Sequence, residues 1–162
     1  MKKENLEIAR ALTKSERIVL PNIESAIRYL SPIQLETLFF KYFNDNGFIV
    51  TSHRGGAKFR IDIEVLENEY LPLLPAFNTK ERVKIQVKRI FDNPKEILEY
   101  LKQNIYFFTL SDIKDSSIVD NPFFIGPHRI NQIFNDKDDE RAKSTVQWVK
   151  AVLGNKIFSY DF

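Results

Sequence analysis

Two short segments of this sequence alternate apolar and polar residues, and their polar positions carry charged and amide side chains. They are residues 60–65 and 84–89. In an extended strand successive side chains point to opposite faces, so Asp62 and Glu64 share one face of the first segment. The corresponding face of the second segment carries the amide of Gln86 between two lysines. If the two strands pair, carboxylates converge beside lysine, an arrangement that suits magnesium-dependent cleavage of a phosphodiester bond.

Glu36 adds a third candidate acid, from a helix predicted over residues 32–46. With about 100° of rotation per residue, its face of the helix also carries apolar residues: Ile33, Phe39, Phe40 and Phe43. Because burying an unpaired carboxylate costs several kcal/mol, we expect a cation, a metal-bound water or hydrogen-bond donors beside it. A structural salt bridge, or a carboxylate that reaches water from the rim of the apolar stripe, explains the pattern equally well.

Composition narrows the possible chemistry. The 162 residues fit one domain with a sizeable core, and fourteen phenylalanines suggest that aromatic rings fill it. The absence of cysteine excludes disulfides, thiolate zinc sites and cysteine nucleophiles, and two histidines are too few for a histidine-rich metal cluster. A net charge of +2 permits a nucleic-acid partner without requiring one. No apolar run approaches the roughly 20 residues that span a bilayer, so we expect a cytoplasmic protein without a membrane partner.

Turn and capping signals divide the chain into elements. The predicted order is helices over 3–12, 22–30 and 32–46, strands over 48–52, 59–66 and 83–90, a helix over 94–104, strands over 105–110 and 122–125, and a helix over 138–153. The third helix has the clearest start, with Ser31 as N-cap, Pro32 at its first position and Gln34 three residues after the cap. This order predicts an α/β domain with a mixed central sheet over residues 31–162, preceded by a helical extension over residues 1–30.

The candidate residues follow one another in a characteristic order: an acid on a helix, a glycine turn, a strand aspartate, and a strand lysine two residues after an amide. The segments that carry this order are Leu35-Glu36-Thr37-Leu38, Asn46-Gly47-Phe48-Ile49-Val50, His53-Arg54-Gly55-Gly56, Ile61-Asp62-Ile63 and Ile85-Gln86-Val87-Lys88-Arg89. In these motifs the chain resembles the PD-(D/E)xK nuclease superfamily, especially the Mrr-like restriction endonucleases, and it is also similar to archaeal Holliday-junction resolvases. The resemblance covers about residues 31–110 and implies a restriction-endonuclease-like fold, a mixed central sheet flanked by helices.

The resemblance also implies a Mg²⁺ site, in which Mn²⁺ could substitute. Asp62 would be the metal-binding aspartate, and Gln86 would occupy the second acidic position, which Mrr-like members often fill with glutamine. Glu36 would hold the metal or its water from the helix, and Glu64 is a further candidate ligand. Lys88 would be the motif lysine. Since the reference pKa of lysine is about 10.4, stabilising negative charge suits it better than acting as a base.

Basic residues around the two segments are candidates for contacts with phosphate. His53 and Arg54 precede the turn Gly55-Gly56, where missing side chains let a phosphate backbone come close. Further basic candidates lie in or beside the two segments: Lys58, Arg60, Lys84 and Arg89. A surface position for the histidine, and a ladder of opposite charges that stabilises the sheet by about 0.2–1 kcal/mol per pair, are the alternatives without a ligand.

Together these inferences predict a magnesium-dependent DNA endonuclease that hydrolyses phosphodiester bonds in defence against foreign DNA. Cutting both strands needs two active sites, so we expect a homodimer. We expect no nucleotide cofactor. One alternative is a nucleic-acid-binding or assembly module of the same fold with weak or no catalysis. The other is a housekeeping α/β protein whose polar sheet face is only a salt-bridge ladder.

Overall fold

Helices and strands succeed one another along the chain, in agreement with the predicted mixed α/β class. The computed structural model describes residues 2–14, 16–45, 49–53, 63–66, 82–135 and 140–162. The helices are α1 (Lys2–Lys14), α2 (Ile23–Ile27), α3 (Pro32–Asp45), α4 (Pro94–Lys102), α5 (Ser116–Val119), α6 (Pro127–Phe134) and α7 (Glu140–Leu153). The strands are β1 (Ile18–Leu20), β2 (Ile49–His53), β3 (Ile63–Leu66), β4 (Arg82–Lys88), β5 (Tyr106–Thr109), β6 (Phe124–Ile125) and β7 (Phe158–Tyr160).

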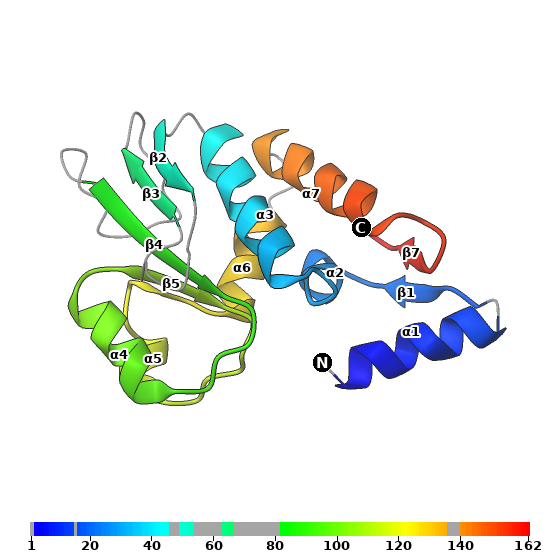
Figure 1. Cartoon of the computed structure of the whole chain (residues 1–162), viewed down its shortest axis with the longest axis horizontal. Coiled ribbons are helices and arrows are strands. Elements are labelled where there is room, and N and C mark those ends of the chain that lie inside the picture. The colour runs from blue at the N-terminus through cyan, green and yellow to red at the C-terminus, as the bar shows by residue number, and fades with distance from the viewer. Residues whose placement is uncertain (1, 15, 46–48, 54–62, 67–81, 136–139) are drawn as a thin grey trace.

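Five of the described strands form one mixed sheet in the order β2-β3-β4-β5-β6. The first three strands are antiparallel neighbours, whereas β4, β5 and β6 are parallel. Parallel neighbours need a crossover, and α4 and α5 provide the helices between them (Figure 1). The sheet therefore changes from antiparallel to parallel at β4, the strand that carries Gln86 and Lys88.

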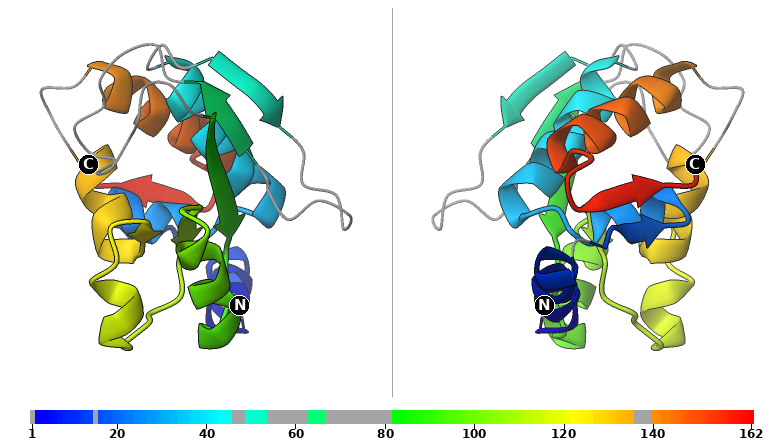
Figure 2. Two further views of the ribbon diagram at one scale, coloured as in Figure 1. Left: turned by 90° about the vertical axis from the view of Figure 1, so that its left-hand side faces the viewer. Right: turned by 90° about the vertical axis from the view of Figure 1, so that its right-hand side faces the viewer.

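Helices cover both faces of this sheet and bury two separate groups of apolar side chains. Ile85 and Val87 of β4 belong to a core that also contains Phe39 of α3. On the other face, Phe107 of β5 packs with Ile97 of α4. Figures 1 and 2 show α3 and α7 side by side over the first face. Alternate residues of β4 therefore point towards α3 and towards α4.

The start of α3 confirms the predicted capping signal. The Ser31 hydroxyl accepts a hydrogen bond from the Gln34 backbone N–H at 3.2 Å, and the Gln34 side chain accepts one from the Ser31 backbone N–H at 2.9 Å. Each side chain thus satisfies a backbone donor that the first turn of a helix leaves without an intrahelical partner. The buried residues of this helix are Leu35, Leu38, Phe39, Tyr42 and Phe43.

The first thirty residues contribute to the main core as well as forming α1. Ile23, Ala26 and Ile27 of α2 are buried with the residues of α3. Before them, β1 pairs in parallel with β7, and Ile18 lies opposite Phe158. The predicted helix over 22–30 is therefore shorter than expected, and the strand that precedes it was not predicted.

Candidate functional site

The described part of the first polar segment, in β3, pairs with β4 as an antiparallel strand. Glu64 of β3 lies opposite Lys84 of β4, one pair beyond Ile63 and Ile85. The polar residues on one face of β4 differ in accessibility: Lys84 is exposed, Gln86 is only 1% exposed, and Lys88 is partly exposed. Gln86 therefore lies inside the protein, beside a cross-strand pair of opposite charges at the surface.

The parallel register between β4 and β5 identifies what surrounds Gln86. Gln86 lies beside Phe107, and Lys88 lies beside Thr109. Phe107 packs towards α4, so the polar row of β4, which consists of Lys84, Gln86 and Lys88, also faces α4. Thr109 is fully buried, and its hydroxyl accepts a hydrogen bond from the backbone N–H of Ser111 at 3.1 Å. The sequence alone does not single out Thr109, because it lies in a largely apolar run and only the strand register places it beside Lys88.

Glu36 lies on α3, which covers the opposite face of the sheet. The predicted apolar stripe is wrong at Ile33, which is 75% exposed because the first turn of α3 presents it to solvent. The buried face is centred instead on Leu38, Phe39 and Tyr42. Glu36 is half-buried at the flank of that face and is not at its centre. The sheet therefore separates the helix of Glu36 from the face of β4 that carries Lys88.

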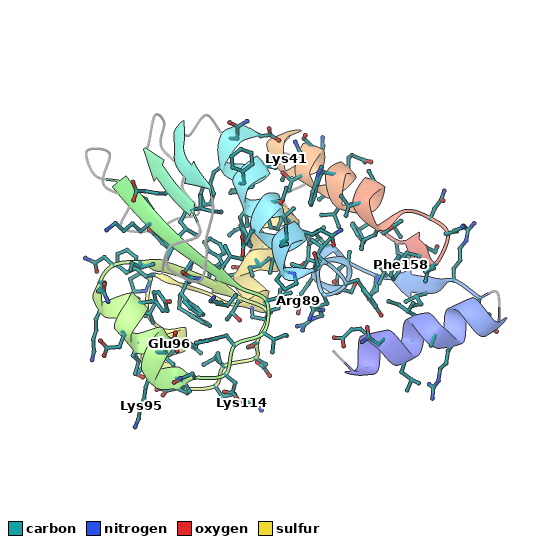
Figure 3. The ribbon with its side chains drawn as sticks, viewed as in Figure 1. Lys41, Arg89, Lys95, Glu96, Lys114 and Phe158 are labelled. Atoms are coloured by element: carbon teal, nitrogen blue, oxygen red, sulfur yellow. The ribbon has the colours of Figure 1, made fainter. Side chains whose placement is uncertain are left out.

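Arg89 directly follows β4, and its guanidinium binds backbone carbonyl groups. Its Nε donates a hydrogen bond to the Leu30 carbonyl at 2.8 Å, and an Nη donates one to the Arg28 carbonyl. The Arg28 side chain in turn donates to the Leu110 carbonyl at 3.4 Å, and the Leu110 N–H donates to the Arg89 carbonyl at 3.0 Å. These hydrogen bonds form a closed ring and occupy the guanidinium that the sequence assigned to phosphate. Arg89 is labelled in Figure 3.

Several predicted site residues lie outside the residues that the structure describes. They are Asp62, Arg54, Gly55, Gly56, Lys58 and Arg60. His53 ends β2 opposite Ile63, and only its backbone is described. Within the described part of the chain, no three histidine, aspartate or glutamate side chains come together as a metal site. The predicted metal-binding aspartate is not part of that set, so its role remains a prediction.

A cavity of about 860 Å³ opens near the carboxyl ends of β5 and β6. Arg28 and Arg129 line it together with acidic side chains, among them Glu24 and Asp112. The Arg28 guanidinium pairs with the Glu24 carboxylate at 2.6 Å. Since both signs of charge line the cavity, its electrostatics select no single charge of ligand.

Comparisons with known proteins find no counterpart: no family model, no curated protein and no solved structure matches this chain. Among the described helices, none combines the length and the apolar character needed to cross a membrane. The fold and the site together define a mixed α/β protein with a partly buried polar row on β4, the strand at which the sheet changes from antiparallel to parallel pairing.

Proposed function

We propose that this protein is a metal-dependent DNA endonuclease with a restriction-endonuclease-like fold. The observation that carries the proposal is the register of β3 against β4, with Glu64 opposite Lys84 and with Gln86 and Lys88 following on the same face. This is the juxtaposition of acidic, amide and ammonium groups that the chemistry requires. Restriction of foreign DNA is the proposed role.

The order of elements supports the same proposal. The chain runs from α3 through β2, β3 and β4 to α4 and β5. This is the order in which the resemblance places a helical acid, a strand acid and a strand lysine. Helices on both faces of the mixed sheet agree with the expected architecture.

The described donor groups fit part of a magnesium site. Mg²⁺ prefers oxygen ligands and retains several waters, and Gln86 and Glu64 supply an amide and a carboxylate from one face of neighbouring strands. Asp62 comes directly before Ile63, whose partner is Ile85, so the proposal requires Asp62 to lie opposite Gln86. When bound, the metal would supply a water of lowered pKa and offset charge on the phosphate oxygens.

Lys88 has a separate part in the proposed reaction. Its ammonium group lies two residues beyond Gln86 on the same face, beside the buried Thr109. In a partly buried site a fixed positive charge stabilises the negative charge that develops on the phosphate during hydrolysis. We assign Lys88 this stabilising role.

A nucleic-acid-binding module without efficient catalysis is the second candidate function. Two observations favour it. Gln86 offers a neutral amide where a carboxylate would bind a metal more strongly, and Glu36 lies on the helix that covers the opposite face. Such a module would bind DNA with an affinity that falls steeply as salt rises, without cutting it.

Plasmid nicking tests these alternatives. The wild-type protein should nick supercoiled plasmid with Mg²⁺ or Mn²⁺ and stop with EDTA. Asp62→Ala should abolish cutting, and Lys88→Ala should slow it by about 100-fold or more, as the loss of one group that stabilises transition-state charge does. Lys102→Ala is the matched control, because its exposed pair with Glu99 at 3.2 Å lies on the surface of α4 and contributes little stability.

Three results separate the possible functions. Cutting by Asp62→Ala at the wild-type rate would show that the site is wrongly assigned. Retarded DNA migration without cleavage would support the binding module, and the absence of both would support a structural role for the polar row. Light scattering with and without DNA tests the homodimer that cutting of both strands requires.

A further inference from the structure

We propose that Arg89 is a positioning residue for the nuclease site, an inference that rests on the proposed function. It fixes the carboxyl end of β4, with Lys88, against the segment that leads into α3, with Glu36. The sequence alone assigns Arg89 to phosphate binding. The observed contacts give its guanidinium a different task.

The two neighbouring residues point to different sides of the sheet. Lys88 shares the face of Gln86, which is turned towards α4. Arg89, one residue later, reaches the carbonyl groups of Arg28 and Leu30 on the α3 side. We call these two hydrogen bonds of the guanidinium the Arg89 anchor. Because Lys88 and Arg89 are adjacent in the chain, any movement of the anchor also moves Lys88.

The anchor meets the chain just before α3 begins. Leu30 is buried, and Pro32 starts the helix two residues later. Arg28 is the C-cap of α2 and Leu30 lies between α2 and α3, and the charged guanidinium supplies the carbonyls of both residues with a hydrogen-bond donor. One side chain thereby connects the end of the strand that carries Lys88 to the segment that precedes the helix carrying Glu36.

The backbone of Arg89 makes the anchor rigid. Its carbonyl accepts a hydrogen bond from the Leu110 N–H at 3.0 Å, which extends the parallel pairing of β4 and β5. The Arg28 side chain closes the ring through the Leu110 carbonyl. The end of β4 is therefore held by its own backbone on one side and by the guanidinium on the other.

Removing this anchor should loosen the site without removing a group that touches metal or DNA. Loss of a residue that orients metal ligands typically weakens metal affinity or activity about 10–100-fold. A displacement of about 1 Å at a catalytic group can cost on the order of 100-fold in rate. We therefore expect Arg89→Ala to bind metal at least about 10-fold more weakly and to cut correspondingly more slowly.

The experiment compares Arg89→Ala and Arg89→Lys with the wild type. Mn²⁺ binding is measured without DNA from the electron paramagnetic resonance signal of the free ion, and plasmid nicking is measured over a range of Mg²⁺ concentrations. DNA affinity is measured separately in EDTA. Arg28→Ala is the matched control, because it removes an arginine from the same ring but leaves the bond from Arg89 to Leu30 in place.

The expected result is weaker Mn²⁺ binding and slower nicking by Arg89→Ala, with unchanged DNA affinity, partial recovery in Arg89→Lys, and near wild-type metal binding in Arg28→Ala. If Arg89→Ala binds metal and nicks plasmid as the wild type does and only its unfolding temperature is lower, Arg89 contributes to stability alone and the positioning role is wrong. If Arg89→Ala binds DNA more weakly but binds metal as the wild type does, Arg89 contacts phosphate, as the sequence predicted, and the positioning role is wrong. If the alanine variant does not fold, Arg89→Lys and Arg89→Gln are compared by the same criteria.

Failure of the nuclease proposal gives a different result. If the wild-type protein neither binds Mn²⁺ nor nicks plasmid, and so behaves as Asp62→Ala is expected to, both the nuclease proposal and the positioning role of Arg89 are overturned. A wild-type protein that binds Mn²⁺ and cuts, beside an Arg89→Ala variant that does the same, would overturn only the positioning role.

Discussion

Replacing Gln86 with glutamate probes both the burial of this position and its proposed contact with metal. Gln86 is 1% exposed, so burial raises the pKa of a carboxyl group placed there and favours its protonated form. In the unfolded chain a glutamate has a pKa of about 4.3. Protonating it at pH 7 costs about 3.7 kcal/mol, because each pH unit above the pKa adds about 1.36 kcal/mol.

This cost is an upper bound on the loss of stability, because Lys88 on the same face favours the ionised carboxylate. The pH dependence has a definite sign. The folded-state pKa of the new group is raised, so the destabilisation is absent below about pH 4.3, amounts to about 1 kcal/mol at pH 5 and increases towards pH 7. A bound Mg²⁺ would oppose it, by about 2.7 kcal/mol when the ion is present at 100 times its dissociation constant.

Urea unfolding at pH 5 and pH 7, in EDTA and in Mg²⁺, measures these terms. Gln86→Leu is the control, since it removes the amide and adds no titratable group, and its effect should not change between the two pH values. If Gln86→Glu is destabilised equally at both pH values, the reasoning from burial is refuted. If the loss of stability of Gln86→Glu depends on pH as expected but Mg²⁺ restores none of it, the burial of position 86 is supported and its contact with metal is contradicted.

Three further predictions concern the fold. Phe39 is fully buried, and its ring centroid lies 4.2 Å from that of Phe108. Phe39→Ala should therefore lower the free energy of unfolding in urea by about 3–5 kcal/mol, and a loss below about 1 kcal/mol would contradict the packing. A Cβ on Gly126 would lie 2.9 Å from the Phe124 ring, so Gly126→Ala should cost about 1–3 kcal/mol by the same assay, whereas wild-type stability would show that the ring moves freely. Burial raises the pKa of Tyr106 to about 12, so stability should fall as the pH rises from about 10 to 12, and Tyr106→Phe should remove that part of the slope; an ordinary ionisation in an ultraviolet titration would refute it.

The sequence predicts best those elements whose signals are local. The capping box of Ser31 and Gln34 places the start of α3, and the predicted end of the last helix at residue 153 agrees with α7, which is followed by Gly154 with a φ of +71°. Alternation along β4 predicts which of its residues share a face, and the pairing with β3 brings a carboxylate, that of Glu64, opposite a lysine, Lys84. In each case neighbouring residues carry the necessary information.

Elements that depend on distant partners were missed. β1 and β7 are three residues each, too short for a recognisable period, and each is stabilised by the other from the far part of the chain. The whole of α6 was also missed, since its N-cap, Gly126, has no side chain to mark the start of the helix. Arg89 was assigned to phosphate from its charge alone. The carbonyls that bind it lie 59 and 61 positions away, where sequence patterns give no signal.

The pairing of β1 with β7 has a consequence for the synthesis of the protein. Ile18 is translated well before its partner Phe158, because the two residues lie far apart in the sequence. The small sheet cannot close before β7 emerges, so β1 remains without its partner strand until then. A ribosome stalled before β7 should therefore carry a nascent chain in which β1 is accessible to protease.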